Sequence, residues 1–282
     1  MNNTQGDPVL REWGQSAPYW EKHARTLRAM IAPLTRALIE EAGINRGQSV
    51  LDVAGGAGEP SLTIAAIVGP GGFVTCTDAV EGMVAAARRE AERLGLPNMT
   101  FRQCAADSLP FNTGSFDRVV SRLGAMFFPD PLGALREMLR VTKPGGAVSL
   151  AVWHRSDLNP FFSVVTGVLS RHIETPPADP CAPGAFRFAD PGDLARILKD
   201  AGAAQVRERL IEFRIEAPLS PKEFWTLRTE VSGTLREKLA LLSEEERGQV
   251  EREVIRDAKR FFSTGQMSFP AQALIVTGEK DR

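Results

Sequence analysis

The fold is decided by the stretch VLDVAGGAGEP, residues 50–60. Residues 50–53 have the short apolar pattern of a buried strand, and the glycines after them supply backbone that can turn sharply and let a ligand lie close. Pro60 suits the first position of a helix, because the N–H that proline lacks would be unpaired there. We therefore expect a strand, a ligand-binding turn and a helix, which is where open α/β sheets bind their ligands.

The spacing of the glycines separates two kinds of ligand. A dinucleotide loop has the pattern G-x-G-x-x-G, and counting from Gly56 its third position is occupied by Ser61. The pattern present is acidic-x-x-x-Gly-x-Gly, formed by Asp52, Gly56 and Gly58. It resembles motif I of the class I S-adenosylmethionine-dependent methyltransferases, with Ala54 in place of the first of three glycines. The ubiquinone and menaquinone biosynthesis methyltransferases are similar here, because they commonly carry Ala-Gly-Gly at this place.

The composition disfavours other classes of protein. A net charge of −1, from 34 basic and 35 acidic residues, gives no field for nucleic acid. Cys76, Cys104 and Cys181 are odd in number and contain no C-x-x-C pair, which disfavours a disulfide framework or a zinc site. The amino terminus lacks the features of a signal peptide, and no stretch is long enough to span a bilayer. We expect a cytoplasmic protein without a metal, nucleic-acid partner or integral membrane segment, which could form a homo-oligomer.

Strand-like and helical patterns alternate along the rest of the chain. Strands are predicted over 73–77, 99–104, 115–121, 147–153, 206–215 and 267–277, with a turn at 143–146. Pro270, near the start of the last strand, is compatible with an edge or with a place outside the pairing. The segment LRVTKPGG, residues 139–146, resembles the corresponding segment of class I methyltransferases, and the final run is similar to their reversed last strand. The fold class expected is α/β, a Rossmann-like doubly wound sheet, mostly parallel with a reversed last strand, plus a helical lid.

The resemblance divides the chain into parts. It is strong over 48–153 and weak over 190–215 and 266–280. The segments 154–189 and 216–265 lie outside it and are expected to form the lid that selects the substrate. The predicted parts are an N-terminal helical cap (1–44), the cofactor-binding core (45–153), a lid insertion with a proline-rich loop at 176–183 (154–189), a continuation of the core (190–215), a helical lid (216–265), and a final core strand and tail (266–282).

Asp78 has two interpretations. As a structural residue it is the N-cap of the next helix, with Glu81 three residues later completing a capping box. As a functional residue it is an acidic side chain at the end of the second strand, where it can accept hydrogen bonds from both ribose hydroxyls of an adenosine. The spacing from Asp52 is close to that of the family and favours the second interpretation.

The resemblance implies which other residues contact S-adenosylmethionine and its product S-adenosylhomocysteine. Asp107 is expected to bind the adenine amino group, with Ala106 beside it, although an ordinary Asx turn is the structural alternative. The complete set of expected cofactor contacts is Asp52, Ala54, Gly55, Gly56, Gly58, Asp78, Ala79, Met83, Ala106, Asp107, Ser108, Ser121 and Arg122.

The methyl acceptor is expected near the amino-terminal helix and the ends of the fourth and fifth strands. The residues expected to bind it are Tyr19, Trp20, Met126, Phe127 and Trp153, for which plain packing is the alternative. Other aromatic residues in the lid indicate a flat or hydrophobic small molecule.

A general base is optional, because a sulfonium methyl group is already activated and the protein has mainly to align the acceptor and exclude water. Among the three histidines, His154 is the first candidate for a base because it follows the fifth strand, and His23 is the second.

The predicted function is in-line methyl transfer from S-adenosylmethionine to an oxygen or carbon of a small, hydrophobic or aromatic metabolite. One alternative is a non-catalytic regulatory protein that binds S-adenosylmethionine. The other is a nucleotide-dependent oxidoreductase, which the glycine spacing opposes.

Overall fold

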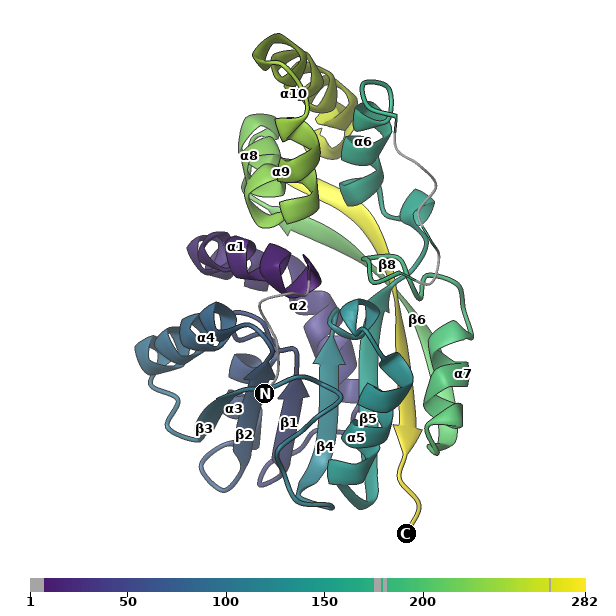
Figure 1. Cartoon of the computed structure of the whole chain (residues 1–282). Coiled ribbons are helices and arrows are strands. Elements are labelled where there is room, and N and C mark those ends of the chain that lie inside the picture. The colour runs from purple at the N-terminus through teal and green to yellow at the C-terminus, as the bar shows by residue number, and fades with distance from the viewer. Residues whose placement is uncertain (1–7, 175–178, 180–181, 264) are drawn as a thin grey trace.

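The computed structural model describes residues 8–174, 179, 182–263 and 265–282. The predicted amino-terminal features at 1–7, the prolines at 176, 177 and 180, and Cys181 lie outside these residues. A sheet with helices on both faces forms the lower part of the molecule, and a cluster of helices lies above it (Figure 1). No helix in the described ranges is long and apolar enough to cross a membrane.

The sheet has the strand order β3-β2-β1-β4-β5-β8-β6, and the short strand β7 pairs with β8. Its strands are β1 (Ser49–Val53), β2 (Phe73–Asp78), β3 (Met99–Gln103), β4 (Phe116–Arg122), β5 (Thr142–Trp153), β6 (Ala204–Ala217), β7 (Phe262–Ser263) and β8 (Gln266–Glu279). The strands from β3 to β5 are parallel, and β8 is antiparallel to both β5 and β6. The mostly parallel sheet with a reversed last strand is therefore confirmed.

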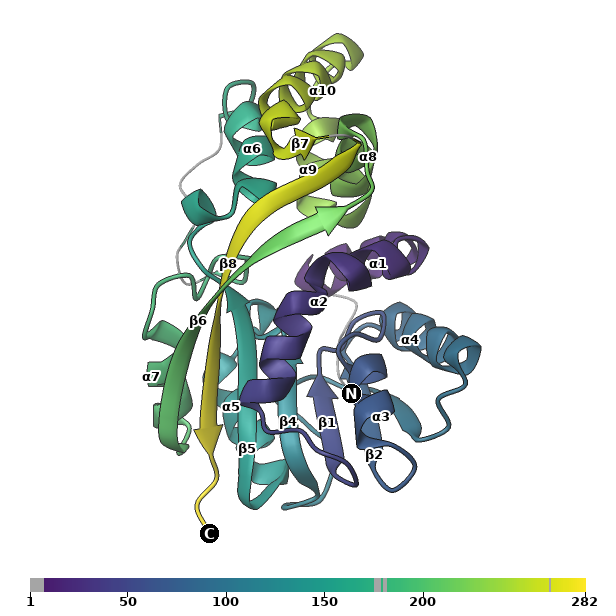
Figure 2. The same ribbon diagram turned by 180° about the vertical axis from the view of Figure 1, so that it is seen from behind.

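Helices cover both faces of this sheet. Figure 1 shows α5 (Pro131–Val141) and α7 (Asp193–Asp200) in front of it, and Figure 2 shows α2 (Ala24–Glu41) and α3 (Ser61–Val68) on the opposite face. α4 (Glu81–Leu94) packs along the β2–β3 side. The sheet core consists mainly of aliphatic side chains such as Val50, Leu51, Val119 and Leu150, all fully buried.

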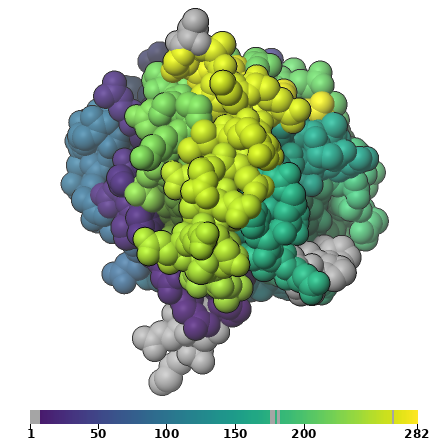
Figure 3. Space-filling model, turned by 90° about the horizontal axis from the view of Figure 1, so that it is seen from above, coloured from purple at the N-terminus to yellow at the C-terminus, as the bar shows by residue number. Residues whose placement is uncertain are grey.

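The upper part is built on two strands that continue out of the sheet. β6 pairs with β8 from Ala204–Glu279 to Ala217–Met267, but β5 pairs only with the later half of β8, from Ala273 onward. The free half of this hairpin carries α6 (Pro160–Leu169), α8 (Pro221–Val231), α9 (Gly233–Ala240) and α10 (Glu244–Ala258), as Figure 2 shows. From above, α10 covers the top of the molecule between α6 and α8 (Figure 3).

An aromatic core holds these lid helices on the hairpin. Phe224 and Phe269 are completely buried, and their ring centroids lie 5.1 Å apart in a stacked arrangement. Phe161, from α6, contacts both rings edge to face at 5.5 and 5.6 Å. Because Phe269 belongs to β8, the lid shares a strand with the main sheet and is continuous with it.

Several local expectations need correction. Pro60 is the N-cap of α3 and not its first residue, because the helix begins at Ser61. The expected turn at 143–146 is part of β5, where the register to β4 shifts between Phe116 and Arg118. Pro270, by contrast, agrees with the expected edge position: it pairs in register with Arg214 but lies beyond the end of β5, so among the described strands it has a neighbour on one side only.

Candidate cofactor and acceptor site

The glycine-rich turn after β1 has a left-handed backbone at three positions. The φ angles are +57° at Ala54, +56° at Gly56 and +113° at Gly58. A Cβ on Gly58 would lie 2.8 Å from Leu62 Cδ1, so this glycine lets the turn pack against α3. A Cβ on Gly56 would meet no atom of the described residues within 4 Å. The turn is thus packed on its inner side and has space beside Gly56.

Asp78 joins this turn to the end of β2. Its Oδ2 accepts a hydrogen bond from Gly56 N at 3.0 Å, and its Oδ1 accepts one from Val80 N at 2.9 Å. The expected capping box is wrong, because the N-cap of α4 is Val80 and Glu81 is the first helical residue. A carboxylate has about four acceptor positions, so Asp78 keeps capacity for further donors such as hydroxyl groups. Burial raises the pKa of Asp78.

Asp52 lies beneath the turn and is completely buried. Its Oδ2 accepts hydrogen bonds from Ser61 Oγ at 2.6 Å and Ser61 N at 3.2 Å, which ties β1 to the start of α3. Burial raises the pKa of Asp52 to about 7, although the bonds from Ser61 oppose the shift. In the part of the chain that the structure describes, Asp52 Oδ1 has no hydrogen-bond partner. A Cβ on Gly55 would lie 2.8 Å from Asp52 Oδ2, which requires glycine at that position.

Ser121 and Arg122 end β4 next to the same turn. Ser121 Oγ is enclosed and has no hydrogen-bond partner within residues 8–174, 179, 182–263 and 265–282. Arg122 donates to Thr35 Oγ1 at 2.5 Å and to Glu59 O at 3.1 Å, so it ties α2 to the glycine-rich turn. Burial lowers the pKa of Arg122. Its described contacts are therefore structural, whereas Ser121 offers a free hydroxyl.

The remaining expected cofactor residues lie around the ends of β2 and β3. Ala79 accepts a hydrogen bond from Gln103 Nε2 at 3.0 Å. Met83 is buried against α1 (Pro8–Lys22), in a cluster with Ala17 and Val80. Ala106 is half-buried, and the two residues after it, Asp107 and Ser108, are exposed.

These observations fit a nucleoside with a charged tail. Among the described residues, Asp78 keeps free acceptor capacity, the enclosed Asp52 Oδ1 and Ser121 Oγ have no partner, and a Cβ at Gly56 would meet no atom within 4 Å. All four positions lie at the carboxyl ends of β1, β2 and β4, which are neighbours in the sheet. This is where a doubly wound sheet binds its ligand.

Helix α1 covers this end of the sheet. The ring of Trp13 lies 5.5 Å from that of Trp20 and 5.1 Å from that of Phe127, both edge to face. Phe127 belongs to the 3₁₀ helix η1 (Ala125–Phe127), which follows β4. Two of the expected acceptor residues, Trp20 and Phe127, are therefore brought together through Trp13. Met126 of the same 3₁₀ helix is buried.

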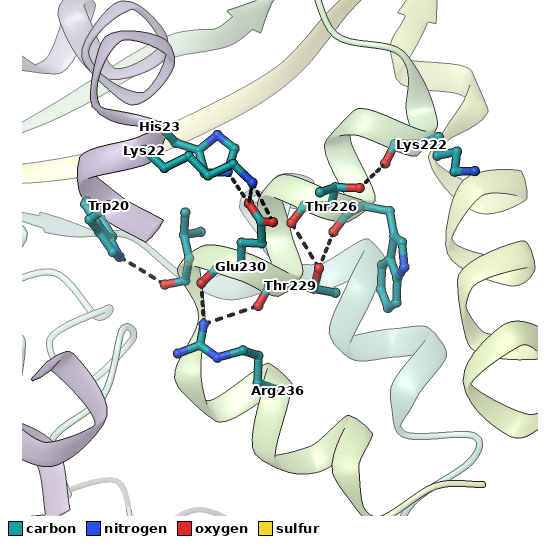
Figure 4. A network of polar contacts seen from close by, with 10 residues as sticks. Trp20, Lys22, His23, Lys222, Thr226, Thr229, Glu230 and Arg236 are labelled. Atoms are coloured by element: carbon teal, nitrogen blue, oxygen red, sulfur yellow. Dashed lines mark hydrogen bonds and ion pairs between the residues drawn. The ribbon is translucent and has the colours of Figure 1, made fainter. Parts of the chain in front are cut away.

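A polar network holds α1 to the lid helices (Figure 4). Trp20 Nε1 donates to Val231 O at 3.0 Å, and Glu230 pairs with Lys22 at 2.7 Å and with His23 Nε2 at 2.5 Å. Arg236 donates to Glu230 O and to Ser16 Oγ, and its guanidinium lies 4.9 Å from the ring of Tyr19. Tyr19, expected to bind the acceptor, and His23, the second candidate base, are thus also part of this clamp.

His154 follows β5 directly. Its Nδ1 lies 2.6 Å from the carbonyl oxygen of Ala189. Because a carbonyl only accepts, Nδ1 carries the hydrogen and the Nε2 of the neutral ring keeps its lone pair. His154 is half-buried and directly follows the buried Trp153.

Trp153, at the end of β5, belongs to an aromatic cluster. Its ring lies 5.1 Å from Phe162 and 6.1 Å from Phe213. Phe162 in turn contacts Phe186 at 5.4 Å and has the guanidinium of Arg228 4.8 Å from its centroid.

Arg228 was not expected in the site, yet a signal was present in the sequence. It follows Phe224 by four residues and precedes Val231 by three, so it lies on the apolar face of its helix. A charged residue on such a face is uncommon without a partner. Glu230 and Arg236 gave no comparable signal, because their partners lie more than 200 residues away.

Comparison with known proteins connects this site to a family. The family model described as a methyltransferase domain matches residues 50–146. The chain is 30% identical over 257 residues to a nocamycin O-methyltransferase of Saccharothrix syringae, covering 87% of this chain and 90% of that protein. It is also 34% identical over 130 residues to a ubiquinone/menaquinone biosynthesis C-methyltransferase of Pasteurella multocida, covering 46% of this chain and 48% of that protein.

Other similarities cover less or concern the fold alone. The chain spans about half the length of several curated relatives, including 46% of uncharacterized mycobacterial proteins that are 36% identical over 131 residues. A structure of phosphoethanolamine N-methyltransferase 2 from Haemonchus contortus, in complex with S-adenosylhomocysteine, is similar in fold, with a TM-score of 0.57 and 17% identity. That similarity covers 97% of this chain and 60% of the other.

Proposed function

The chain belongs to the class I S-adenosylmethionine-dependent methyltransferases, and from this premise we propose that it methylates an oxygen or carbon atom of a small apolar or aromatic molecule. The observation that carries the proposal is the aromatic lining around the end of β4 and β5. Trp13 contacts Phe127, which follows the end of β4, and Trp153 is the last residue of β5. Flat apolar molecules are held well by such side chains.

The relatives favour oxygen as the accepting atom. The alignment with the nocamycin O-methyltransferase covers 87% of the chain, so it includes much of the lid. The alignment with the C-methyltransferase covers only 46%, which is less than half of the chain. Since the lid is expected to select the acceptor, the relative that shares it is the better guide to the reaction.

Each part of the site has a task in this reaction. S-adenosylmethionine supplies, when bound, a methyl group already activated by its sulfonium. Asp78 accepts hydrogen bonds from the ribose hydroxyls, and Asp52 and Ser121 offer polar atoms to the methionine part. Trp13 and Trp20 exclude water and hold the acceptor in line, which is the main catalytic contribution for a reaction of this type.

His154 is positioned to take a proton from an acidic acceptor. Its Nδ1–H is held by Ala189 O, which leaves Nε2 to receive the proton of a hydroxyl group as the bond to the methyl group forms. His23 suits this task less, because its Nε2 is paired with Glu230.

The experiment is a screen of purified protein with isotopically labelled S-adenosylmethionine and a panel of phenols, aromatic acids, enols and amines. The proposal predicts label transfer to a phenol, enol or acid, with stoichiometric S-adenosylhomocysteine. Transfer to amines alone would contradict it. Tight binding of S-adenosylmethionine without transfer to any member of a broad panel would favour the regulatory alternative.

A further inference from the structure

Arg228 of α8 is a buried cation in the lid. The residue is 7% exposed, and its Nε is enclosed without a hydrogen-bond partner among the described residues. Its guanidinium carbon lies 4.8 Å from the ring centroids of both Phe161 and Phe162, which belong to α6. Within the described ranges, no carboxylate pairs with this guanidinium.

Burial of an unpaired charge destabilises a protein. Burial alone lowers the pKa of Arg228 to about 10, so the side chain is still charged at neutral pH. The two phenylalanine rings offset part of the lost hydration through cation–π contacts, but within the described ranges they leave the enclosed Nε–H without an acceptor. An apolar side chain of similar length would fill this place without that cost. The arginine is therefore better explained by a ligand than by packing.

The ring contacts connect Arg228 to the proposed acceptor site. Phe162, on which it lies, contacts Trp153 at 5.1 Å and Phe186 at 5.4 Å. The segment before Phe186 reaches the end of β4, because Gly184 N donates to Met126 O at 3.1 Å. The guanidinium is thus one aromatic ring away from residues expected to hold the acceptor.

We propose that Arg228 binds a carboxylate or enolate group of a flat, apolar methyl acceptor. This rests on the proposed function and specifies its substrate as an anion. The planar guanidinium matches the two oxygens of such a group and can donate two parallel hydrogen bonds to it. The aromatic side chains hold the apolar part of the acceptor between Arg228 and the end of β4. The bound anion supplies the acceptor that the buried Nε–H lacks.

The test measures binding of naphthoate and its uncharged amide, naphthamide, by calorimetry. The protein is saturated with S-adenosylhomocysteine, and its affinity for that molecule is measured separately. Wild-type protein is expected to bind naphthoate about tenfold more tightly than naphthamide. Arg228→Met should reduce this preference to about twofold or less, and Arg228→Lys should keep part of it. Arg260→Met is the matched control, because Arg260 also lies 4.8 Å from a phenylalanine ring but is exposed.

A second readout separates binding from packing. Arg228→Met should leave the melting temperature unchanged or raise it. If the arginine served only to stabilise the fold, the substitution would lower the melting temperature. Equal affinity of wild-type protein for naphthoate and naphthamide overturns the proposal, as does a preference that survives in Arg228→Met. If Arg228→Met does not fold, the test compares the preference for naphthoate over naphthamide in wild type and in Arg228→Lys.

Two further outcomes keep this proposal separate from the proposed function. A loss of S-adenosylhomocysteine affinity in Arg228→Met would assign the guanidinium to the cofactor's own carboxylate and overturn the inference. Preferential naphthoate binding by wild type, abolished in Arg228→Met, would support it even if the labelling screen found no methyl transfer.

Discussion

Asp78 holds two parts of the cofactor site together, since one carboxylate accepts from Gly56 N and Val80 N. We predict that Asp78→Ala weakens S-adenosylmethionine binding by about 1 to 3 kcal/mol, because hydroxyl groups lose a charged acceptor. Calorimetric titration measures the change. Asp117→Ala is the control, because Asp117 lies at the amino end of β4 and binds Lys143 and Ser49 N. Unchanged affinity in Asp78→Ala would remove this residue from the site.

Asp52 makes stability depend on pH in an unusual direction. Burial raises its pKa from 3.8 to about 7, so between these values the folded state binds a proton that the unfolded state releases. The free energy of unfolding therefore falls as the pH rises through this window. Between pH 5 and pH 8, we predict that the free energy of unfolding of Asp52→Asn falls by about 2 to 4 kcal/mol less than that of the wild type.

Urea denaturation at several pH values tests this. Asp117→Asn is a suitable control, because hydrogen bonds from Lys143 and Ser49 outweigh burial and lower the pKa of Asp117. That residue contributes stability above its unfolded pKa, which is lost only in acid. Parallel pH profiles for wild type and Asp52→Asn would show that Asp52 is ionised throughout.

Sequence spacing predicts where Asp78 and Asp52 lie but not which groups hydrogen-bond to them. The position of Asp78 follows from the end of a predicted strand, whereas its bond to Gly56 N depends on the left-handed turn at that glycine. Arg228 was missed because no local pattern states whether a charged residue on an apolar face has a partner.

Glu230 is one of the residues that hold helix α1 to the lid, because it binds Lys22 and His23. We predict that Glu230→Gln weakens this attachment by about 1 kcal/mol, since the pair is partly exposed. Hydrogen exchange of the amides in 8–22 should become about fivefold faster, with little change in the sheet. Glu237→Gln, on the exposed side of α9, is the control. Equal exchange in both variants would contradict a clamp at Glu230.

The same clamp has a pH dependence with the ordinary sign. Hydrogen bonds from Lys22 and His23 lower the pKa of Glu230. Its contribution is therefore complete above the pKa of an unfolded glutamate and is lost as the pH falls through the lowered value.

Element types were predicted well where the pattern was long and apolar, and less well at junctions. Residues 147–153 form a strand as expected, but β5 begins already at Thr142. The reason is that strand pairing with β4 continues, after a register shift, through a segment that looks like a turn. Similarly, a proline near a helix start is compatible with both the N-cap and the first helical position, and Pro60 occupies the N-cap.

Across the whole molecule, the extended β6–β8 hairpin makes the lid part of the sheet. Alternation and glycine turns predict that both strands exist, but pairing partners are decided by contacts far apart in sequence. The half of β8 that leaves β5 is stabilised by Phe224 and Phe161, and neither residue is near it in the chain.

This continuity predicts cooperative unfolding. Phe224→Ala removes a fully buried ring and should lower stability by about 3 to 5 kcal/mol. Because core and lid share β8, calorimetric scanning should show a single transition at a lower temperature. Exposed Phe73, at the start of β2, is the control for Phe→Ala. Two separated transitions, with the core melting unchanged, would contradict a shared strand as the source of stability.

The most direct test of the central claim is calorimetric titration of the purified protein with S-adenosylmethionine, S-adenosylhomocysteine and NADH. The arrangement of Asp52, Asp78 and the glycine-rich turn predicts micromolar binding of the first two, about −8 kcal/mol, and no binding of NADH. Binding of NADH alone would contradict this prediction, because it would show that the glycine-rich turn binds a dinucleotide.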